Sequence, residues 1–225
     1  MIVYGKQVFF YILQKHKHLI NEIYLAKECD KATFNNIIKE GFKINKLDFK
    51  KAQSMSKNGN HQGFLMDIKE YDFADFAVLK KQNFLVLLYG LCDIGNVGAI
   101  ARSAYAFGVD GLLLSNELPM SGVIRASCGA ALDIKIALKK DVLSLLNELK
   151  LEGFSIYSSA KEGKDVRGFK FSDKKILIMG SEGFGLPNKI LKKSDEILSI
   201  NMKNDFDSLN VNAAFSILCD RIVNG

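Results

Sequence analysis

Four segments rich in glycine, serine, asparagine and acidic residues carry the side chains best suited to chemistry. They are GLCDIGNVGAIARS (90–103), SAKEGKD (159–165), GSEGFGLP (180–187) and NMKNDFDSLN (201–210). Each follows a stretch that is typical of a buried strand. Ligands of open parallel sheets bind outside the carboxyl ends of the strands, so we expect these segments to meet around a ligand. Small residues let backbone groups approach that ligand closely, as a cradle for a nucleoside requires.

The signatures of several common catalytic and cofactor sites do not occur in the sequence. There is no phosphate loop of the form G-x-x-x-x-G-K-[ST], no HExxH and no GxSxG. Cys92 stands at the middle glycine position of a dinucleotide-binding pattern whose outer positions are Gly90 and Gly95. The three histidines all lie within the first 61 residues, which excludes a histidine-based centre in the later part of the chain. These features argue against a nucleotide-dependent α/β enzyme, an alternative that the finding of bound NAD would revive.

Arginine is scarce in this lysine-rich chain, which makes Arg102 a candidate for chemistry. It lies six residues after Asn96, less than two helical turns away, so the two side chains do not share one helix face. The spacing alone favours a structural role for Arg102, in an ion pair with an acid such as Asp93 or Glu182.

The elements that would position these residues alternate between strand and helix. Phe84–Tyr89 is continuously apolar and is bounded by Gly90, a pattern typical of a strand buried on both faces. The alternation predicts an α/β fold with a mostly parallel sheet. Further strands are expected at Gly111–Ser115, Phe154–Ser158, Lys175–Gly180 and Glu196–Ile200, and helices at Val97–Phe107, Asp141–Lys150, Pro187–Lys192 and Leu209–Val223.

The first part of the chain differs from the rest in charge. Residues 1–70 hold 12 lysines and 7 acidic residues, whereas the remaining 155 residues hold 19 basic and 18 acidic ones. A basic end fits a polyanionic partner and fits a soluble lysine-rich surface equally well. Within this part we expect short elements: a helix at Val8–Leu19, a strand at Glu22–Leu25 and a helix at Thr33–Glu40.

The cysteines and the apolar runs bear on compartment. Cys29, Cys92, Cys128 and Cys219 form no CxxC pair and have no histidine at metal-ligand spacing, which predicts buried free thiols and no metal site. No apolar run reaches the roughly 20 residues of a membrane helix. The N-terminus is too charged for a signal peptide. We therefore expect a soluble cytoplasmic protein without a membrane partner.

Three motifs in the later part, in this order, resemble those of the SpoU (TrmH-type) family of RNA ribose 2′-O-methyltransferases, within the SPOUT superfamily. They are NVGAIARSAYAFG (96–108), MGSEGFGLP (179–187) and SINMKNDFDSLNVNAA (199–214). Between the first two, IRASCGAALDI (124–134) resembles a further stretch of the family. The first part is similar to the small RNA-binding domain of many such enzymes, at YGKQVFFYIL (4–13) and HQGFLMDI (61–68).

The resemblance implies an architecture and a reaction. It implies a substrate-binding domain at 1–71 that resembles a ribosomal protein, a connector at 72–83 and a SPOUT methyltransferase domain with a deep trefoil knot at 84–225. The implied cofactor is S-adenosyl-L-methionine (SAM), held mainly by backbone groups, and the implied active site lies at the interface of a homodimer. The implied substrate is RNA, with a guanosine ribose of large-subunit rRNA expected, and tRNA as the alternative. A non-catalytic RNA-binding protein of the same fold is the other alternative.

The resemblance also assigns site residues. Arg102 is expected either to act as the base with help from an RNA phosphate, or to anchor that phosphate and stabilise the developing alkoxide. Asn96 and Asn210 would orient Arg102 and the ribose. Glu182 would fix Asn96 or its own loop, or else cap the helix at Pro187. The expected catalytic set is Asn96, Arg102, Glu182, Ser208 and Asn210, and the expected cofactor set is Ser159, Ala160, Gly180, Gly183, Ile200, Met202 and Leu209.

Three details of the third motif qualify these assignments. Ser208 would contact cofactor or substrate, or else act as a helix N-cap. Met202 and Leu209 would flank the adenine. Asn201 replaces a proline usual in the family, and Asn212 replaces a serine, which affects the local backbone and a polar contact near the site.

Overall fold

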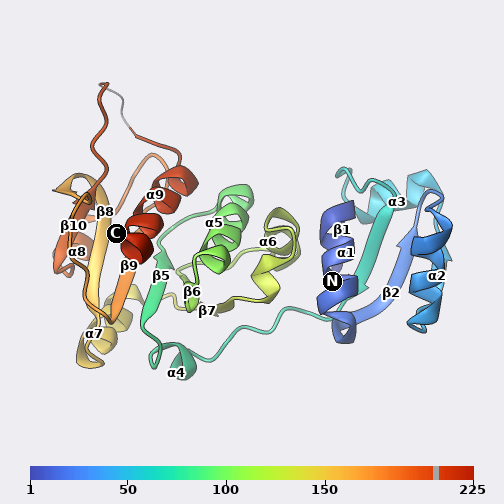
Figure 1. The fold of residues 1–225 in the computed structure, drawn as a ribbon, viewed down its shortest axis with the longest axis horizontal. Helices are drawn as coiled ribbons and strands as arrows, with labels where there is room; N and C mark the ends of the chain where they lie inside the picture. Colours follow the sequence, from blue (N-terminus) through green and yellow to red (C-terminus); the bar gives the residue numbers. More distant parts are fainter. Residues whose placement is uncertain (205–207) are drawn as a thin grey trace.

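The computed structural model describes residues 1–204 and 208–225, which form two α/β parts lying side by side (Figure 1). The N-terminal part contains a four-stranded sheet of order β1-β4-β2-β3. In it β4 runs antiparallel to both of its neighbours, whereas β3 is parallel to β2. Its strands are β1 (Ile2–Tyr4), β2 (Ile20–Leu25), β3 (Ile44–Lys46) and β4 (Phe64–Ile68), and its helices are α1 (Lys6–Lys15), a 3₁₀ turn (Lys17–Leu19), α2 (Lys31–Lys39) and α3 (Phe49–Met55).

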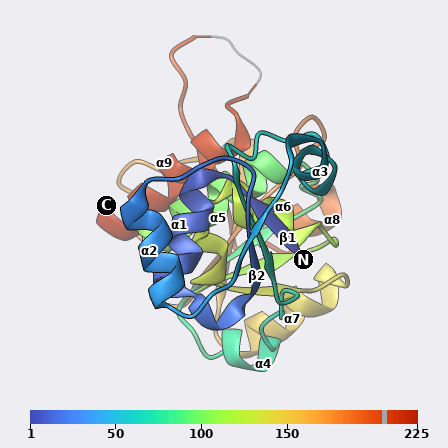
Figure 2. The ribbon, with the colours of Figure 1, turned by 90° about the vertical axis from the view of Figure 1, so that its right-hand side faces the viewer.

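Local capping explains where the helices of this part begin. The carboxylates of Asp30 and Asp48 accept the backbone N–H of Thr33 and Lys51, each at 2.8 Å, and so start α2 and α3. Figure 1 shows α1 on the side of the small sheet that faces the larger part, and α2 on the far side. Figure 2 views the molecule from this end, so that the small sheet lies in front of the larger one.

The larger part contains a six-stranded sheet of order β10-β8-β9-β5-β6-β7, in which every strand pair is parallel. This confirms the α/β fold class expected from the sequence. The strands are β5 (Phe84–Leu88), β6 (Gly111–Leu114), β7 (Lys135–Leu138), β8 (Ser155–Asp165), β9 (Lys175–Met179) and β10 (Glu196–Ser199).

Helices cover both faces of this sheet, because side chains alternate in direction along each strand. Val86 and Leu88 of β5 join one buried cluster with residues of α5, α6 and α9, whereas Leu85 and Leu87 join a second with residues of α4, α7 and α8. All five residues of β5 are buried, which explains why the strand is continuously apolar. The helices are α4 (Phe76–Leu79), α5 (Ile94–Ala106), α6 (Met120–Ala126), a 3₁₀ turn (Ala130–Leu132), α7 (Val142–Leu151), α8 (Asn188–Leu191) and α9 (Val211–Asn224).

The expected elements of the larger part all occur, with ends displaced by a few residues except in β8. This strand runs seven residues beyond its expected end at Ser158. The strand β7 and the helix α6 were not anticipated, because both are short and lack a clear period. β10 pairs with β8 at the sheet edge, and α9 then returns to pack on α5. The trefoil knot implied by the resemblance stays a prediction.

Two further expectations concern the thiols and the membrane. All four cysteines are free, but only Cys219 is buried, and Cys92 is exposed. The expectation of buried thiols is therefore wrong for Cys92, which follows the turn after β5 rather than packing in the core. Within the described residues, none of the helices has the length and apolar character needed to cross a membrane.

Candidate active site

A cluster of three polar side chains joins two loops at the carboxyl ends of neighbouring strands to the start of α9. The amide Nδ2 of Asn96, near the start of α5, donates to Oε1 of Glu182 at 2.9 Å. Nδ2 of Asn210, at the start of α9, donates to Oδ1 of Asn96 at 2.9 Å and to Oε1 of Glu182 at 3.1 Å. Since β5 and β9 are adjacent, their following loops bring residues 86 positions apart into contact. The sheet thus assembles three of the five expected catalytic residues.

Helix caps fix two of these residues in place. Asp93 caps α5 and accepts the backbone N–H of Asn96 at 2.6 Å. Asn210 caps α9, and its Oδ1 accepts the backbone N–H of Asn212 at 3.0 Å. The N-termini of both helices therefore lie at the cluster, and their positive dipole ends favour the negative carboxylate of Glu182.

The loop that carries Glu182 depends on glycines. Gly183 and Gly185 adopt φ angles of +84° and +61°, in the left-handed region that favours glycine. A Cβ on Gly180 would lie 2.5 Å from the carbonyl carbon of Gly185, so no other residue fits there. The resulting tight turn, closed by a bond from the N–H of Gly185 to the carbonyl of Ser181 at 2.9 Å, holds Glu182 towards the two helix starts.

The hydrogen-bonding capacity of the cluster indicates a holding role. A carboxylate only accepts, so both asparagines must turn their NH₂ groups towards Glu182. Oδ1 of Asn96 then accepts from Nδ2 of Asn210. Oδ1 of Asn210 accepts from the backbone N–H groups of the first turn of α9. The arrangement orients the two loops and the start of α9 relative to one another. The alternative that Glu182 caps the helix at Pro187 is wrong, because α8 has no side-chain cap.

Arg102 lies apart from this cluster. It is six residues further along α5, a rise of roughly 9 Å. Its Nη1 donates to Sγ of Cys128 at 3.6 Å, and the guanidinium is exposed. The ion pair with Asp93 or Glu182 favoured by the spacing is therefore wrong, because the described hydrogen bond of the guanidinium goes to Cys128 and no described carboxylate pairs with it.

Ser208 lies three residues before the first residue of α9. It is exposed, and the helix-cap alternative for it is wrong, since Asn210 is the N-cap of α9. The sequence contained a signal for this cap, because asparagine is as good an N-cap as serine and Asn210 stands two residues nearer the apolar pattern of the helix.

The expected cofactor residues fall into two groups. Ile200 and Met202 line a hollow of about 550 Å³, a size suited to a nucleoside-containing ligand. The other lining residues come from β8, from the last residue of β10 and from the segment that follows it: Lys161, Gly163, Asp165, Ser199, Asn201, Lys203 and Asn204. Gly180, Gly183, Ser159, Ala160 and Leu209 are not among the described residues that line it.

The segment with Ser159 and Ala160 leaves the sheet ladder. Ser158 pairs with Ile197, but the next pair joins Leu198 to Lys164, so residues 159–163 bulge out between them. A Cβ on Gly163 would lie 2.5 Å from the carbonyl carbon of Leu198, so glycine is required where the bulge returns to β10. This crossing could not be predicted from the sequence, because Gly163 lies among charged residues typical of a loop.

The two departures from the family pattern have different surroundings. Asn201 is exposed and lines the hollow. Oδ1 of Asn212 is buried and has no hydrogen-bond partner among the described residues. A buried acceptor without a partner is costly, so this atom is suited to receive an N–H from a ligand. Among the described residues, no group of three or more His, Cys, Asp or Glu side chains could hold a metal ion.

Comparison with known proteins identifies the family. Residues 83–220 match the SpoU rRNA Methylase family, and residues 2–74 match the RNA 2′-O ribose methyltransferase substrate-binding domain. The chain is 32% identical over 217 residues to a tRNA/rRNA methyltransferase of Borreliella burgdorferi, which covers 88% of this chain and 95% of that protein. The chain therefore belongs to the SpoU family of RNA methyltransferases, as the motifs indicated.

Two other proteins are informative. A 23S rRNA (guanosine-2′-O-)-methyltransferase, RlmB, of Vibrio cholerae is 25% identical over 96% of this chain and 93% of its own length. The SpoU methyltransferase AviRb from Streptomyces viridochromogenes, solved with the cofactor AdoMet, superposes with a TM-score of 0.79 at 19% identity, covering 99% of this chain and 89% of that one. The cofactor expected from the resemblance is thus the one held by a protein of the same fold.

Proposed function

We propose that this protein transfers a methyl group from SAM to a ribose 2′-hydroxyl of a guanosine in large-subunit rRNA, in the cytoplasm. One observation carries the proposal: hydrogen bonds among Asn96, Glu182 and Asn210 join all three family motifs at one edge of the sheet. The relative from Vibrio cholerae, whose name specifies guanosine in 23S rRNA, supports the choice of substrate. A tRNA substrate is the second candidate, favoured by the tRNA/rRNA name of the relative from Borreliella burgdorferi.

The two parts of the chain would divide the work. Residues 1–71 would bind RNA through their excess of lysine, since phosphate contacts supply much of the affinity for nucleic acids. Residues 84–225 would bind the methyl donor and carry out the transfer, with 72–83 as the connector between them.

The surroundings of the hollow fit the cofactor. Ile200 and Met202 supply apolar surface for the adenine. Leu209, 37% exposed, is available to cover a bound ring. Gly180, Gly183, Ser159 and Ala160 would offer backbone groups from the two neighbouring loops. When bound, SAM supplies a methyl group that is already strongly electrophilic.

The task of the protein is then to help a weak nucleophile. A ribose hydroxyl must lose its proton as its oxygen gains the methyl group. The guanidinium of Arg102 is a poor base because it stays charged in proteins. We therefore assign to Arg102 the anchoring of an RNA phosphate and the stabilisation of the developing alkoxide. Ser208, which is exposed, would contact the substrate.

A homodimer would bring Arg102 and the cluster of Asn96, Glu182 and Asn210 together. Arg102 contacts Cys128 and makes no described hydrogen bond to the cluster of its own chain. A second copy would bring the Arg102 of one chain to the cluster of the other. The exposed Ile217 and Val223 of α9 provide apolar surface for such a contact. Light scattering of the purified protein should give twice the mass of the 25.1 kDa chain; a monomer at assay concentration contradicts the shared site.

Mapping of 2′-O-methylation in total RNA tests the function. Cells that lack the gene should lose one ribose methyl group in large-subunit rRNA. Loss in tRNA instead supports the second candidate, and an unchanged map in both contradicts the proposal. Arg102→Lys should abolish most methyl transfer while SAM still binds by calorimetry, because lysine cannot present the planar fork to a phosphate. A chain that binds RNA but not SAM would instead be a non-catalytic member of the fold.

A further inference from the structure

The contact between Arg102 and Cys128 continues into the N-terminal part. Sγ of Cys128 accepts from Nη1 of Arg102 at 3.6 Å and donates to Oε1 of Gln7 at 3.1 Å. Gln7 belongs to α1 and Cys128 follows α6, so three elements from both parts of the chain meet at one thiol. A thiol is a weak donor and a weak acceptor, and here it uses both capacities.

The backbone holds Cys128 firmly at this place. Its φ angle is +56°, and that of Gly129 is +99°, so two consecutive left-handed residues end α6. The N–H of Cys128 reaches the carbonyl of Arg125 at 3.1 Å, and the N–H of Gly129 reaches that of Ile124 at 2.8 Å. A cysteine in the left-handed region is uncommon because this backbone conformation is unfavourable, and the two backbone hydrogen bonds offset its energetic cost.

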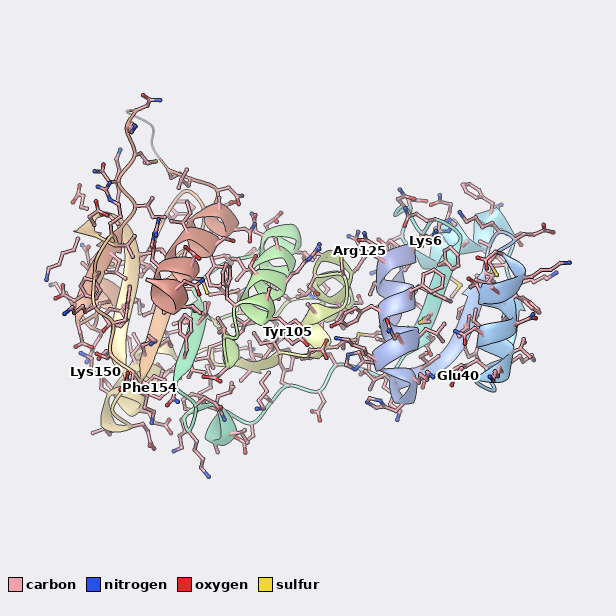
Figure 3. All side chains as sticks on the ribbon, in the orientation of Figure 1. Lys6, Glu40, Tyr105, Arg125, Lys150 and Phe154 are labelled. Atoms are coloured by element: carbon pink, nitrogen blue, oxygen red, sulfur yellow. The ribbon has the colours of Figure 1, made fainter. Side chains whose placement is uncertain are left out.

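The docking of α1 fixes Gln7 relative to Cys128. A Cβ on Gly129 would lie 2.4 Å from the ring of Tyr11, so the end of α6 meets α1 at the closest possible distance. Tyr11 donates its hydroxyl to Asp133, and Nε2 of His16 lies 3.3 Å from the same carboxylate. On the other side the guanidinium of Arg125 stands 5.0 Å from the ring centroid of Tyr4. Figure 3 shows Arg125 at this junction between the two parts.

We propose that Gln7 and Cys128 are positioning residues, through which the docked N-terminal part orients the guanidinium of Arg102. This inference rests on the proposed function, in which Arg102 meets the substrate RNA. An exposed arginine samples many rotamers, and a directional contact on Nη1 restricts them. The part of the chain that would bind RNA thereby prepares the side chain that acts on it. Misplacement of a reacting group by about 1 Å can cost as much as about a hundredfold in rate.

Substitutions at Cys128 separate positioning from folding. Alanine and serine both have a Cβ, so neither changes the cost of the left-handed backbone. Serine keeps a donor and an acceptor, whereas alanine keeps neither. We expect Cys128→Ala to lower kcat by about ten- to a hundredfold with an unchanged KM for SAM, and Cys128→Ser to retain most of the activity.

Gln7 offers a matched control on its own helix. We expect Gln7→Ala to lower kcat to a similar extent as Cys128→Ala. Gln14 lies two turns further along α1, is exposed, and has no side-chain hydrogen bond among the described residues. Gln14→Ala should therefore leave kcat unchanged. Equal kcat in the wild type, Gln7→Ala and Cys128→Ala, or an equal loss in Cys128→Ser and Cys128→Ala, would overturn the proposal.

A second readout follows Arg102 directly. The chain has four arginines, so an NMR spectrum of the arginine Nε–Hε groups contains four signals, and Arg102→Lys identifies one by its disappearance. This signal should shift and sharpen in Gln7→Ala and Cys128→Ala, as the side chain gains mobility. An Arg102 signal unchanged in both refutes the positioning. If the wild type transfers no methyl group to RNA, the proposed function fails separately, and the spectrum alone still decides whether Gln7 and Cys128 hold Arg102.

Discussion

The side-chain amide of Asn210 stabilises the structure in two separable ways, one through its oxygen and one through its nitrogen. Oδ1 caps α9 by accepting the N–H groups of Asn212 and Ala213, while Nδ2 donates to Asn96 and Glu182. Asn210→Ala removes both contributions. Asn210→Ser keeps a capping oxygen and removes only the donor. The pair of variants therefore measures the cap and the cluster independently.

The structure sets the size of each effect. Loss of an asparagine cap costs about 1 kcal/mol. Loss of the two bonds from Nδ2 costs about another 1 kcal/mol, since the cluster is near the surface and water partly replaces them. We therefore expect Asn210→Ala to lower the free energy of unfolding by about 2 kcal/mol, and Asn210→Ser by about 1 kcal/mol. For a chain of this length the difference corresponds to roughly 2–4 °C in Tm.

Urea denaturation followed by circular dichroism measures these free energies, and transfer of labelled methyl groups to RNA measures turnover. Both variants should lose most turnover, because both release Asn96 and Glu182 from the start of α9. Full turnover in Asn210→Ser would refute the need for the cluster. Equal stability of the two variants would refute the cap.

Three further predictions concern packing, thiols and pH. A Cβ on Gly98 would lie 2.3 Å from a Cβ on α6, so Gly98→Ala should lower the free energy of unfolding by about 1–3 kcal/mol; an unchanged thermal transition contradicts the close contact of α5 and α6. Burial raises the pKa of the Cys219 thiol to about 12, so at pH 8 a disulfide reagent should leave Cys219 unmodified while it reacts with the exposed Cys92; similar rates would contradict the burial. Hydrogen bonds from the hydroxyl and then the N–H of Ser144 lower the pKa of the Asp141 carboxyl, so its stabilisation is present above the unfolded pKa and is lost as the pH falls through the folded one. The stability difference between the wild type and Asp141→Asn should therefore shrink on acidification from about pH 5 to pH 2, and a constant difference would contradict the cap.

The sequence predicted the larger sheet well because its strands carry a strong signal. Phe84–Leu88 is buried on both faces, and a parallel strand buried in this way is continuously apolar. In contrast, Lys135–Leu138 forms the sheet edge with an exposed lysine and only two fully buried residues, and nothing in its composition separates it from a loop. The extension of β8 to Asp165 was also hidden, because Lys161, Glu162 and Lys164 have the composition of an exposed turn.

The site was predictable where its residues follow strands, and not where tertiary packing decides. Asn96 and Glu182 meet because their loops follow parallel strands that end at one edge of the sheet, a rule that can be applied to a sequence. Asn210 joins them from the start of α9. The direction of Arg102 could not be found from spacing, because it depends on how α1 docks against the end of α6. The contact of Cys128 with Arg102 could not be predicted either. It depends on a left-handed backbone at the end of a helix, where the usual residue is glycine.

The chemical position of the transferred methyl group tests the account most directly. The purified protein is incubated with ribosomal RNA and SAM labelled in its methyl group, and the RNA is then digested to nucleosides and separated by mass. We predict label on the ribose of one guanosine, present with the wild type and nearly absent with Arg102→Lys. Label on a base, or equal ribose labelling by both proteins, would contradict it.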